Sequence, residues 1–222
     1  MGGVGFAAVV LAGGAGRRLG GRGKPLLPVG GRPMLERVLD AVATAEPRVV
    51  VGPLELALPP GVLRTREEPP GGGPVAALAA GLALVPEPAG QVAVLAADLP
   101  FLTAADLRAL WPVPGADGCV FVDEGGRDQW LCGMWWTAAL RSRLAAVGDV
   151  AGRSLREVLS PLRVVRITAA SHPAPWYDCD TEDQLRAAQA AAAVKASAVK
   201  ASAVKASAVK RPEPGDDKEW SG

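Results

Sequence analysis

Short apolar segments alternate along this chain with segments that have helical periodicity. Runs rich in Ala, Val and Leu, typical of buried strands, occupy Ala7–Leu11, Arg48–Val51, Gln91–Ala96, Gly118–Val122, Leu131–Trp136 and Arg163–Ile167. Apolar spacing of three and four residues, or a capping residue at the start, predicts helices over Arg32–Ala45, Pro74–Val85, Thr103–Leu110, Thr137–Val147, Ser154–Leu159 and Thr181–Gln189. Strands that alternate with helices favour an α/β fold with a mostly parallel central sheet and helices on both faces.

One region departs from this alternation. The turn-like stretch D-E-G-G-R-D (Asp123–Asp128) separates two of the predicted strands without a helix between them. Two strands joined by so short a connection pair antiparallel. We therefore expect a hairpin or an antiparallel strand to interrupt the parallel order here.

The last thirty residues have a different composition. After about Ala190 the chain repeats V-K-A-S-A, and the predicted domain therefore covers residues 1–192, with a tail over 193–222. Five residues advance a helix by about 140°, so neither the lysines nor the valines build one face. The tail is predicted to be a solvated helical extension or a disordered segment.

Composition excludes several classes of protein. The 222 residues have a net charge of +1 and 5% aromatic residues, which indicates no nucleic-acid surface. No apolar run reaches the roughly 18 residues that a membrane helix needs, and no basic segment precedes the short apolar run at the N-terminus. Three cysteines without metal-site spacing are typical of a reducing compartment. We expect a cytoplasmic protein without nucleic-acid or membrane partners.

The most informative motif is the stretch Val9–Pro25, V-V-L-A-G-G-A-G-R-R-L-G-G-R-G-K-P. An apolar strand leads into a loop of glycines and basic residues, which suits an anion bound by backbone N–H groups and neutralised by Arg and Lys. The dinucleotide-binding motif is excluded because Leu19 stands where its third glycine belongs, and the P-loop because Arg18 and Pro25 break its pattern.

With these two motifs excluded, the chain resembles the molybdenum cofactor guanylyltransferase family, whose opening motif is L-A-G-G-x-x-x-R-M-G-x-x-D-K. Three further segments match that family in the same order: Gly71–Gly81, Ala96–Leu102 and Trp176–Leu185. The chain departs from the family at Leu19, which replaces Met, and at Gly23, which replaces an acidic residue before the lysine.

The resemblance implies a single Rossmann-like nucleotidyltransferase domain that joins GMP from GTP to molybdopterin and releases pyrophosphate. Mg²⁺ is the implied cofactor. The implied catalytic residues are Lys24, Asp98 and Arg18, with Asp98 as the metal ligand. The residues expected to bind the nucleotide are Leu11, Ala12, Gly13, Gly14, Lys24, Gly52, Glu68 and Asp98.

The residues themselves support some of these roles. Asp98 follows an apolar strand and Thr103 already supplies the next helix cap, which favours a metal ligand over a cap for Asp98. A carboxylate at Glu68, with Glu67 as the other option, can accept hydrogen bonds from both donor groups of guanine. Asp178 and Asp180 precede the last predicted helix, either as metal or substrate ligands or as charges that stabilise its N-terminus. The polar hairpin Asp123–Trp130 is a candidate acceptor surface.

Two alternatives stay open. The chain could be a cytidylyl- or uridylyltransferase that acts on molybdopterin or on a sugar or polyol phosphate, or a nucleotide-binding module without catalytic activity. The expected partners are GTP and molybdopterin, and molybdoenzymes that receive the product. The expected assembly is a monomer or a weak oligomer.

Overall fold

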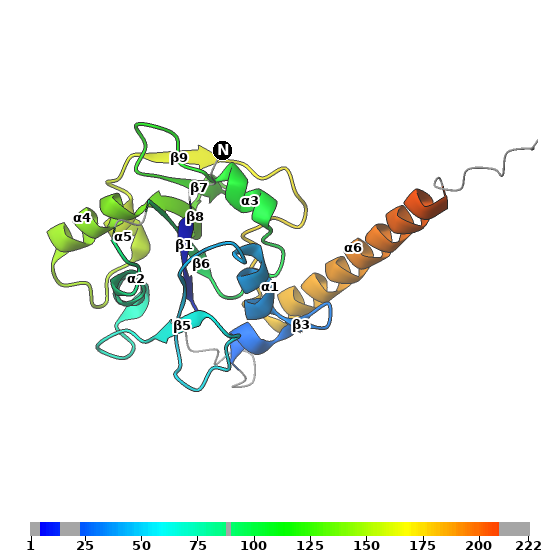
Figure 1. Ribbon diagram of the computed structural model, residues 1–222, viewed down its shortest axis with the longest axis horizontal. Helices are drawn as coiled ribbons and strands as arrows, with labels where there is room; N and C mark the ends of the chain where they lie inside the picture. The colour runs from blue at the N-terminus through cyan, green and yellow to red at the C-terminus, as the bar shows by residue number, and fades with distance from the viewer. Residues whose placement is uncertain (1–4, 14–22, 88–89, 209–222) are drawn as a thin grey trace, which may run out of the picture.

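The computed structural model describes residues 5–13, 23–87 and 90–208. Within them, one seven-stranded sheet forms the centre of the molecule, with the strand order β5-β4-β1-β6-β8-β7-β9 (Figure 1). These strands are β1 (Phe6–Leu11), β4 (Arg48–Val51), β5 (Val62–Thr65), β6 (Gln91–Ala96), β7 (Gly118–Val122), β8 (Asp128–Trp136) and β9 (Val164–Ile167). Two short strands, β2 (Pro28–Val29) and β3 (Arg32–Pro33), pair only with each other.

Strand β8 runs antiparallel to its neighbours β6 and β7, whereas every other pair in the sheet is parallel. The turn after Asp123 therefore produces the antiparallel interruption that the sequence predicts. In a sheet of this kind, loops at the carboxyl ends of the parallel strands meet at one edge, which is where ligands usually bind. The ends of β1, β4 and β6 lie next to one another at that edge.

Helices cover both faces of the sheet (Figure 1). The helices are α1 (Met34–Ala41), α2 (Gly73–Ala83), α3 (Ala104–Ala109), α4 (Thr137–Val147), α5 (Leu155–Leu159) and α6 (Glu182–Ala208), with a 3₁₀ turn over Lys24–Leu26. One apolar core lies between the sheet and α1 and α3, and the other lies between the opposite face and α2, α4 and α5. Side chains of alternate strand residues point to opposite faces of the sheet and fill the two cores. The fold is the predicted α/β arrangement, with helices on both faces.

Strand β5 was not among the predicted strands. It lies at the edge of the sheet, pairs only with β4, and leaves Leu63 43% exposed. An edge strand that buries so little of its surface needs no apolar run, which is the signal used for the other strands.

The predicted helix over Arg32–Ala45 is shorter in the structure. Arg32 and Pro33 belong to β3, which turns back from β2 through Gly30 and Gly31, and α1 then extends only from Met34 to Ala41. Both glycines have positive φ angles, 58° and 79°, which other residues rarely adopt. The two glycines thus allow the tight turn that delays the start of the helix.

Helix α6 extends well beyond the Gln189 at which the last predicted helix ends. It is a continuous helix of 27 residues that passes through the predicted boundary at 192/193 and projects away from the sheet (Figure 1). Its first turns pack on the domain, because Ala188 and Ala192 are buried in a small third cluster with Val29 and Met34. None of the helices in the described residues is long and apolar enough to cross a membrane.

Candidate functional site

The part of the candidate site that is predicted to bind the nucleotide lies where β1 ends. The backbone of Ala12 donates to Val51 of β4 at 2.7 Å, and Ala97 donates to Leu11 at 3.0 Å. Leu11 and Ala12 are buried, whereas Gly13 is exposed at the start of the motif loop. The predicted residues Gly14 and Arg18 lie outside the described residues. Backbone hydrogen bonds on both sides therefore fix the point from which this loop leaves the sheet.

Gly52 allows two chain segments to approach closely at this edge. A Cβ atom on Gly52 would lie 3.1 Å from the carbonyl carbon of Ala12, closer than ordinary van der Waals contact. The Gly52 N–H donates to Thr65 of β5 at 3.0 Å. The structure thus gives Gly52 a packing role beside the motif loop, and its predicted nucleotide contact stays a prediction.

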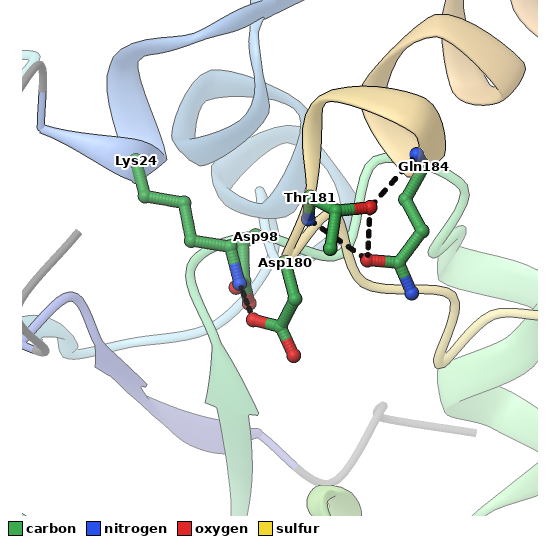
Figure 2. Close-up of polar contacts among 5 residues, drawn as sticks. All are labelled: Lys24, Asp98, Asp180, Thr181 and Gln184. Carbon is green, nitrogen blue, oxygen red and sulfur yellow. Dashed lines mark hydrogen bonds and ion pairs between the residues drawn. The ribbon is translucent and has the colours of Figure 1, made fainter. Parts of the chain in front are cut away.

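Lys24, Asp98 and Asp180 meet at one point although they are distant in sequence (Figure 2). The Lys24 ammonium forms ion pairs with the carboxylates of Asp98 and Asp180, the latter at 2.6 Å. Lys24 comes from the 3₁₀ turn after the motif loop, Asp98 follows β6, and Asp180 precedes α6. Two residues of the predicted site, Lys24 and Asp98, are therefore brought together, and Asp180 joins them.

Burial and charge act in opposite directions on Lys24. Its side chain is only 16% exposed, and this burial by itself lowers the pKa. The hydrogen bonds to Asp180 and Asp98 and the charges of both carboxylates outweigh burial, so the Lys24 pKa is raised above its ordinary value. Lys24 is consequently a permanent cation at neutral pH, as a group that binds phosphate must be.

The start of α6 explains how Asp180 reaches this point. The Thr181 hydroxyl accepts a hydrogen bond from the Gln184 backbone at 3.2 Å, and the Gln184 side chain accepts one from the Thr181 backbone at 2.9 Å (Figure 2). This reciprocal pair caps the helix, as the sequence predicts. Because Thr181 provides the cap, the Asp180 carboxylate is available for Lys24.

Asp178 lies in the same region with a different electrostatic environment. Its pKa is raised above the ordinary value by burial and by the negative charges of Asp180 and Asp98, against the opposing effect of Lys24. Cys179, between the two aspartates in sequence, is fully buried, and burial is the main reason that its pKa rises to about 12. The thiol stays protonated at neutral pH, which excludes Cys179 as a nucleophile in this state.

The two candidates for base recognition differ in the structure. Glu67 accepts a hydrogen bond from the Gly71 backbone at 3.0 Å, which closes the turn before α2. Glu68 is exposed. Since Glu67 holds the turn, Glu68 is the better candidate of the pair to contact a ligand.

A cavity of about 410 Å³ adjoins Lys24, Asp98, Asp178 and Asp180. Of the polar hairpin predicted to face an acceptor, only Gln129 and Trp130 line this cavity. Of the hairpin's other charged residues, Asp123 forms an ion pair with Arg127, and Asp128 forms one with Arg166 of β9.

Sequence reasoning missed Arg156 and Trp176, which also line the cavity. Trp176 is the first residue of the recognised segment W-Y-D-C-D-T. Its position within a motif was the only signal that could have identified it.

The donor set at Lys24 is suited to a hard cation. Two carboxylates, from Asp98 and Asp180, already share one positive group. Among the described residues, no group of three or more His, Cys, Asp or Glu side chains could hold a metal ion. A cation bound here would therefore take most of its ligands from substrate and water, which is the usual manner of Mg²⁺.

Sequence comparison finds clear relatives. A family described as "MobA-like NTP transferase domain" matches residues 8–167. A protein of Rhodobacter capsulatus named molybdenum cofactor guanylyltransferase is 30% identical over 190 residues, covering 83% of this chain and 95% of the relative. A protein with the same name from Xanthomonas euvesicatoria pv. vesicatoria is 34% identical over 186 residues, covering 81% of this chain and 92% of the relative.

Solved structures share the fold at lower identity. Molybdopterin-guanine dinucleotide biosynthesis protein A from Archaeoglobus fulgidus superposes with a TM-score of 0.67 and 22% identity, covering 85% of this chain and 99% of that one. A 2-C-methyl-D-erythritol 4-phosphate cytidylyltransferase from Thermus thermophilus superposes with a TM-score of 0.63 and 20% identity, covering 85% and 98%. Likeness at this level establishes the fold and leaves the substrate open.

Proposed function

Because the chain belongs to the MobA-like NTP transferase domain family, we propose that it transfers GMP from GTP to molybdopterin in molybdenum cofactor biosynthesis. The observation that carries the proposal is the meeting of Lys24 with Asp98 and Asp180 at the carboxyl edge of the sheet. The names of the sequence relatives support guanylyl transfer over transfer of another nucleotide.

The proposed reaction is a displacement at phosphorus. A phosphate oxygen of the acceptor attacks the α-phosphorus of GTP, and the bond from this phosphorus to the oxygen that bridges to the β-phosphate breaks. Pyrophosphate leaves with the electron pair of that bond. Negative charge builds on the phosphoryl oxygens and on the leaving group, so the protein contributes mainly positioning and electrostatic stabilisation.

We propose that Lys24 stabilises the negative charge on the phosphoryl oxygens and the leaving group. In the structure it forms ion pairs with Asp98 and Asp180. In the proposed complex its ammonium contacts a phosphate oxygen of GTP and stabilises the charge of the transition state. Leu11, Ala12 and Gly13 are proposed to contact the nucleotide through their backbone, and Glu68 to accept hydrogen bonds from guanine.

Asp98 and Asp180 fit Mg²⁺ because their carboxylates are hard oxygen donors that already share one cation. When bound, Mg²⁺ would neutralise phosphate charge at the reacting group. The protein's contribution to this metal site is to hold the carboxylates of Asp98 and Asp180 close to each other. Asp98, which is only 15% exposed, has a more fixed position than Asp180, which is 56% exposed.

A direct assay tests the proposal. The protein is incubated with Mg²⁺, molybdopterin and one of the four NTPs at a time, and released pyrophosphate is measured. We expect pyrophosphate with GTP and loss of the signal with EDTA. A preference for CTP or UTP would contradict guanylyl transfer and favour a cytidylyl- or uridylyltransferase. GTP binding without turnover would instead indicate a nucleotide-binding module.

A further inference from the structure

The cavity beside Lys24 straddles the end of the sheet. Ala96, the last residue of β6, and Leu131 and Cys132 of β8 contribute to its lining, together with Leu99 and Leu155. At about 410 Å³, the cavity lies within the range of about 300–1,000 Å³ that small-molecule sites occupy. Apart from the charged residues at the Lys24 end, most of this lining is apolar. The cavity can therefore take a ligand that combines a phosphate with an apolar or aromatic body.

Two tryptophans reach this cavity from opposite faces of the sheet. Trp130 packs with the core under α2, α4 and α5, where its ring stacks on Trp135 with centroids 6.1 Å apart and planes inclined by 23°. Trp176 packs with the core under α1 and α3, where its ring lies 5.3 Å from that of Phe121. Each indole is held by an aromatic neighbour, so both are fixed before any ligand binds.

Polar groups with incomplete hydrogen bonding complete the lining. The Gln129 amide nitrogen donates to the Asp123 carboxylate at 3.1 Å and to the Arg127 carbonyl, which identifies the other amide atom as the oxygen. Within the described residues, that oxygen accepts no hydrogen bond and Arg156 forms no ion pair. The cavity thus offers one acceptor for ring N–H groups and one cation for an anionic substituent.

We infer that Trp130 and Trp176 determine acceptor specificity by holding a flat heteroaromatic ring between their indoles, with the acceptor phosphate toward Lys24. This inference rests on the proposed function, and it names the residues that recognise the acceptor. A polyol phosphate would leave its hydroxyl groups against indole and aliphatic carbon, and unpaired hydroxyl groups are costly to bury. An aromatic ring instead stacks on the indoles and leaves no hydroxyl group unpaired.

The first test is binding in the absence of GTP. Neopterin, a pterin without a phosphate, is titrated into the protein and into the variants Trp130→Leu and Trp176→Leu, and heats of binding are recorded. We expect each variant to raise the dissociation constant about five- to fifty-fold. Trp130→Phe, which keeps an aromatic face, should recover most of the affinity. Equal affinity in the protein and both leucine variants would overturn the inference.

The matched control is Trp111→Leu. Trp111 is half-buried and packs edge-on against Phe6 at 5.9 Å, but it does not line the cavity. The control removes an indole of comparable burial, and its affinity for neopterin should match that of the unchanged protein. Glycerol 3-phosphate serves as the non-aromatic probe. Tight binding of glycerol 3-phosphate without binding of neopterin would also overturn the inference.

Steady-state kinetics with GTP and molybdopterin separate this inference from the proposed function. We expect the two leucine variants to raise the KM for molybdopterin about five- to fifty-fold and to leave the KM for GTP unchanged. Guanylyl transfer that is insensitive to both tryptophans would refute the inference while the proposed function stands. Tryptophan-dependent neopterin binding without transfer from any NTP would refute the proposed function while the inference stands.

Discussion

The two sides of the candidate site, one proposed to bind the nucleotide and the other the acceptor, are built in different ways. On the nucleotide side, small residues and backbone groups meet closely: Ala12 is hydrogen-bonded to β4, and a Cβ atom on Gly52 would lie 3.1 Å from Ala12. On the acceptor side, large side chains such as Trp130 and Trp176 surround a cavity. Lys24 and its two carboxylates lie at the border between them.

This difference predicts two kinds of response to substitution. A backbone-built surface depends on the packing beneath it, so changes there should alter stability and nucleotide binding together. A surface built from side chains can lose a contact while its supporting strands remain in place. The predictions below begin at the border, where the largest effect is expected, and move outward.

Asp98→Ala should have the largest effect on activity. It removes the carboxylate proposed to hold Mg²⁺, and a lost electrostatic contact at a reacting phosphate typically costs about 10²–10³-fold in kcat. Lys24 keeps its ion pair with Asp180 in this variant, so the melting temperature should change little.

The matched control for Asp98→Ala is Asp40→Ala. Asp40 also forms an ion pair, with Arg32 at 2.6 Å, but in an exposed position on α1. Its removal should leave kcat unchanged, because Asp40 does not line the cavity beside Lys24. It should also change stability little, because exposed ion pairs contribute about 1 kcal/mol or less. Unaltered turnover in Asp98→Ala would contradict the assignment of Asp98 as the metal ligand.

Gly81→Ala should have the largest effect on stability. A Cβ atom on Gly81 of α2 would collide with Val9 of β1 and lie 2.9 Å from Val51 of β4. Overpacking of this kind costs about 1–3 kcal/mol, and urea unfolding would measure it. Because β1 and β4 support Ala12 and Gly52, the KM for GTP should rise as well.

The double variant Val9→Ala with Gly81→Ala sharpens this test. Val9→Ala removes the two Val9 methyl groups that the new Cβ atom would meet. The double variant should therefore lose less stability than the sum of the losses in the two single variants. Strict additivity of the two free energies would mean that the collision between α2 and β1 is not the cause.

Asp178→Asn should give a smaller, pH-dependent effect. Burial, together with the charges of Asp180 and Asp98, raises the Asp178 pKa, so the folded protein holds this proton more tightly than the unfolded chain does. That contribution to stability is present below the ordinary carboxyl pKa and is lost as pH rises through the raised value. Asparagine should therefore raise the melting temperature at pH 7 and leave it unchanged at pH 3. A gain of equal size at both pH values would contradict this assignment.

The features that could be predicted from sequence are those with local signals. Strand β1 and the glycine-rich loop that follows it produce a short pattern with fixed spacing, and the turn at Gly125 and Gly126 predicts the antiparallel strand. The edge strand β5 gave no such signal, because only one of its sides pairs and little of it is buried. A sequence pattern arises where burial or a turn restricts which residues fit, and an edge strand is restricted at few positions.

The acceptor side could not be predicted in the same way. Trp130, Arg156 and Trp176 come from β8, α5 and the loop before α6, and only the fold brings them to one cavity. The ion pair of Lys24 with Asp180 spans 156 positions in the sequence. Side chains that gather over such separations have no characteristic spacing, so their meeting becomes visible only in the structure.

Removal of residues 199–222 should have the smallest effect, because the described side-chain contacts of α6 with the domain lie before residue 199. Among the described side chains of α6, Ala188 and Ala192 are buried against the domain, and Lys195 lies over the Phe101 ring at 5.1 Å. A chain that ends at Ala198 keeps all three residues, and its melting temperature and guanylyl transfer should match those of the full chain. A chain that ends at Ala187 loses both buried alanines and should lose about 1–2 kcal/mol of stability. If the shorter deletion lowered stability or transfer, the repeats would be part of the folded domain, and the predicted boundary at 192/193 would be wrong.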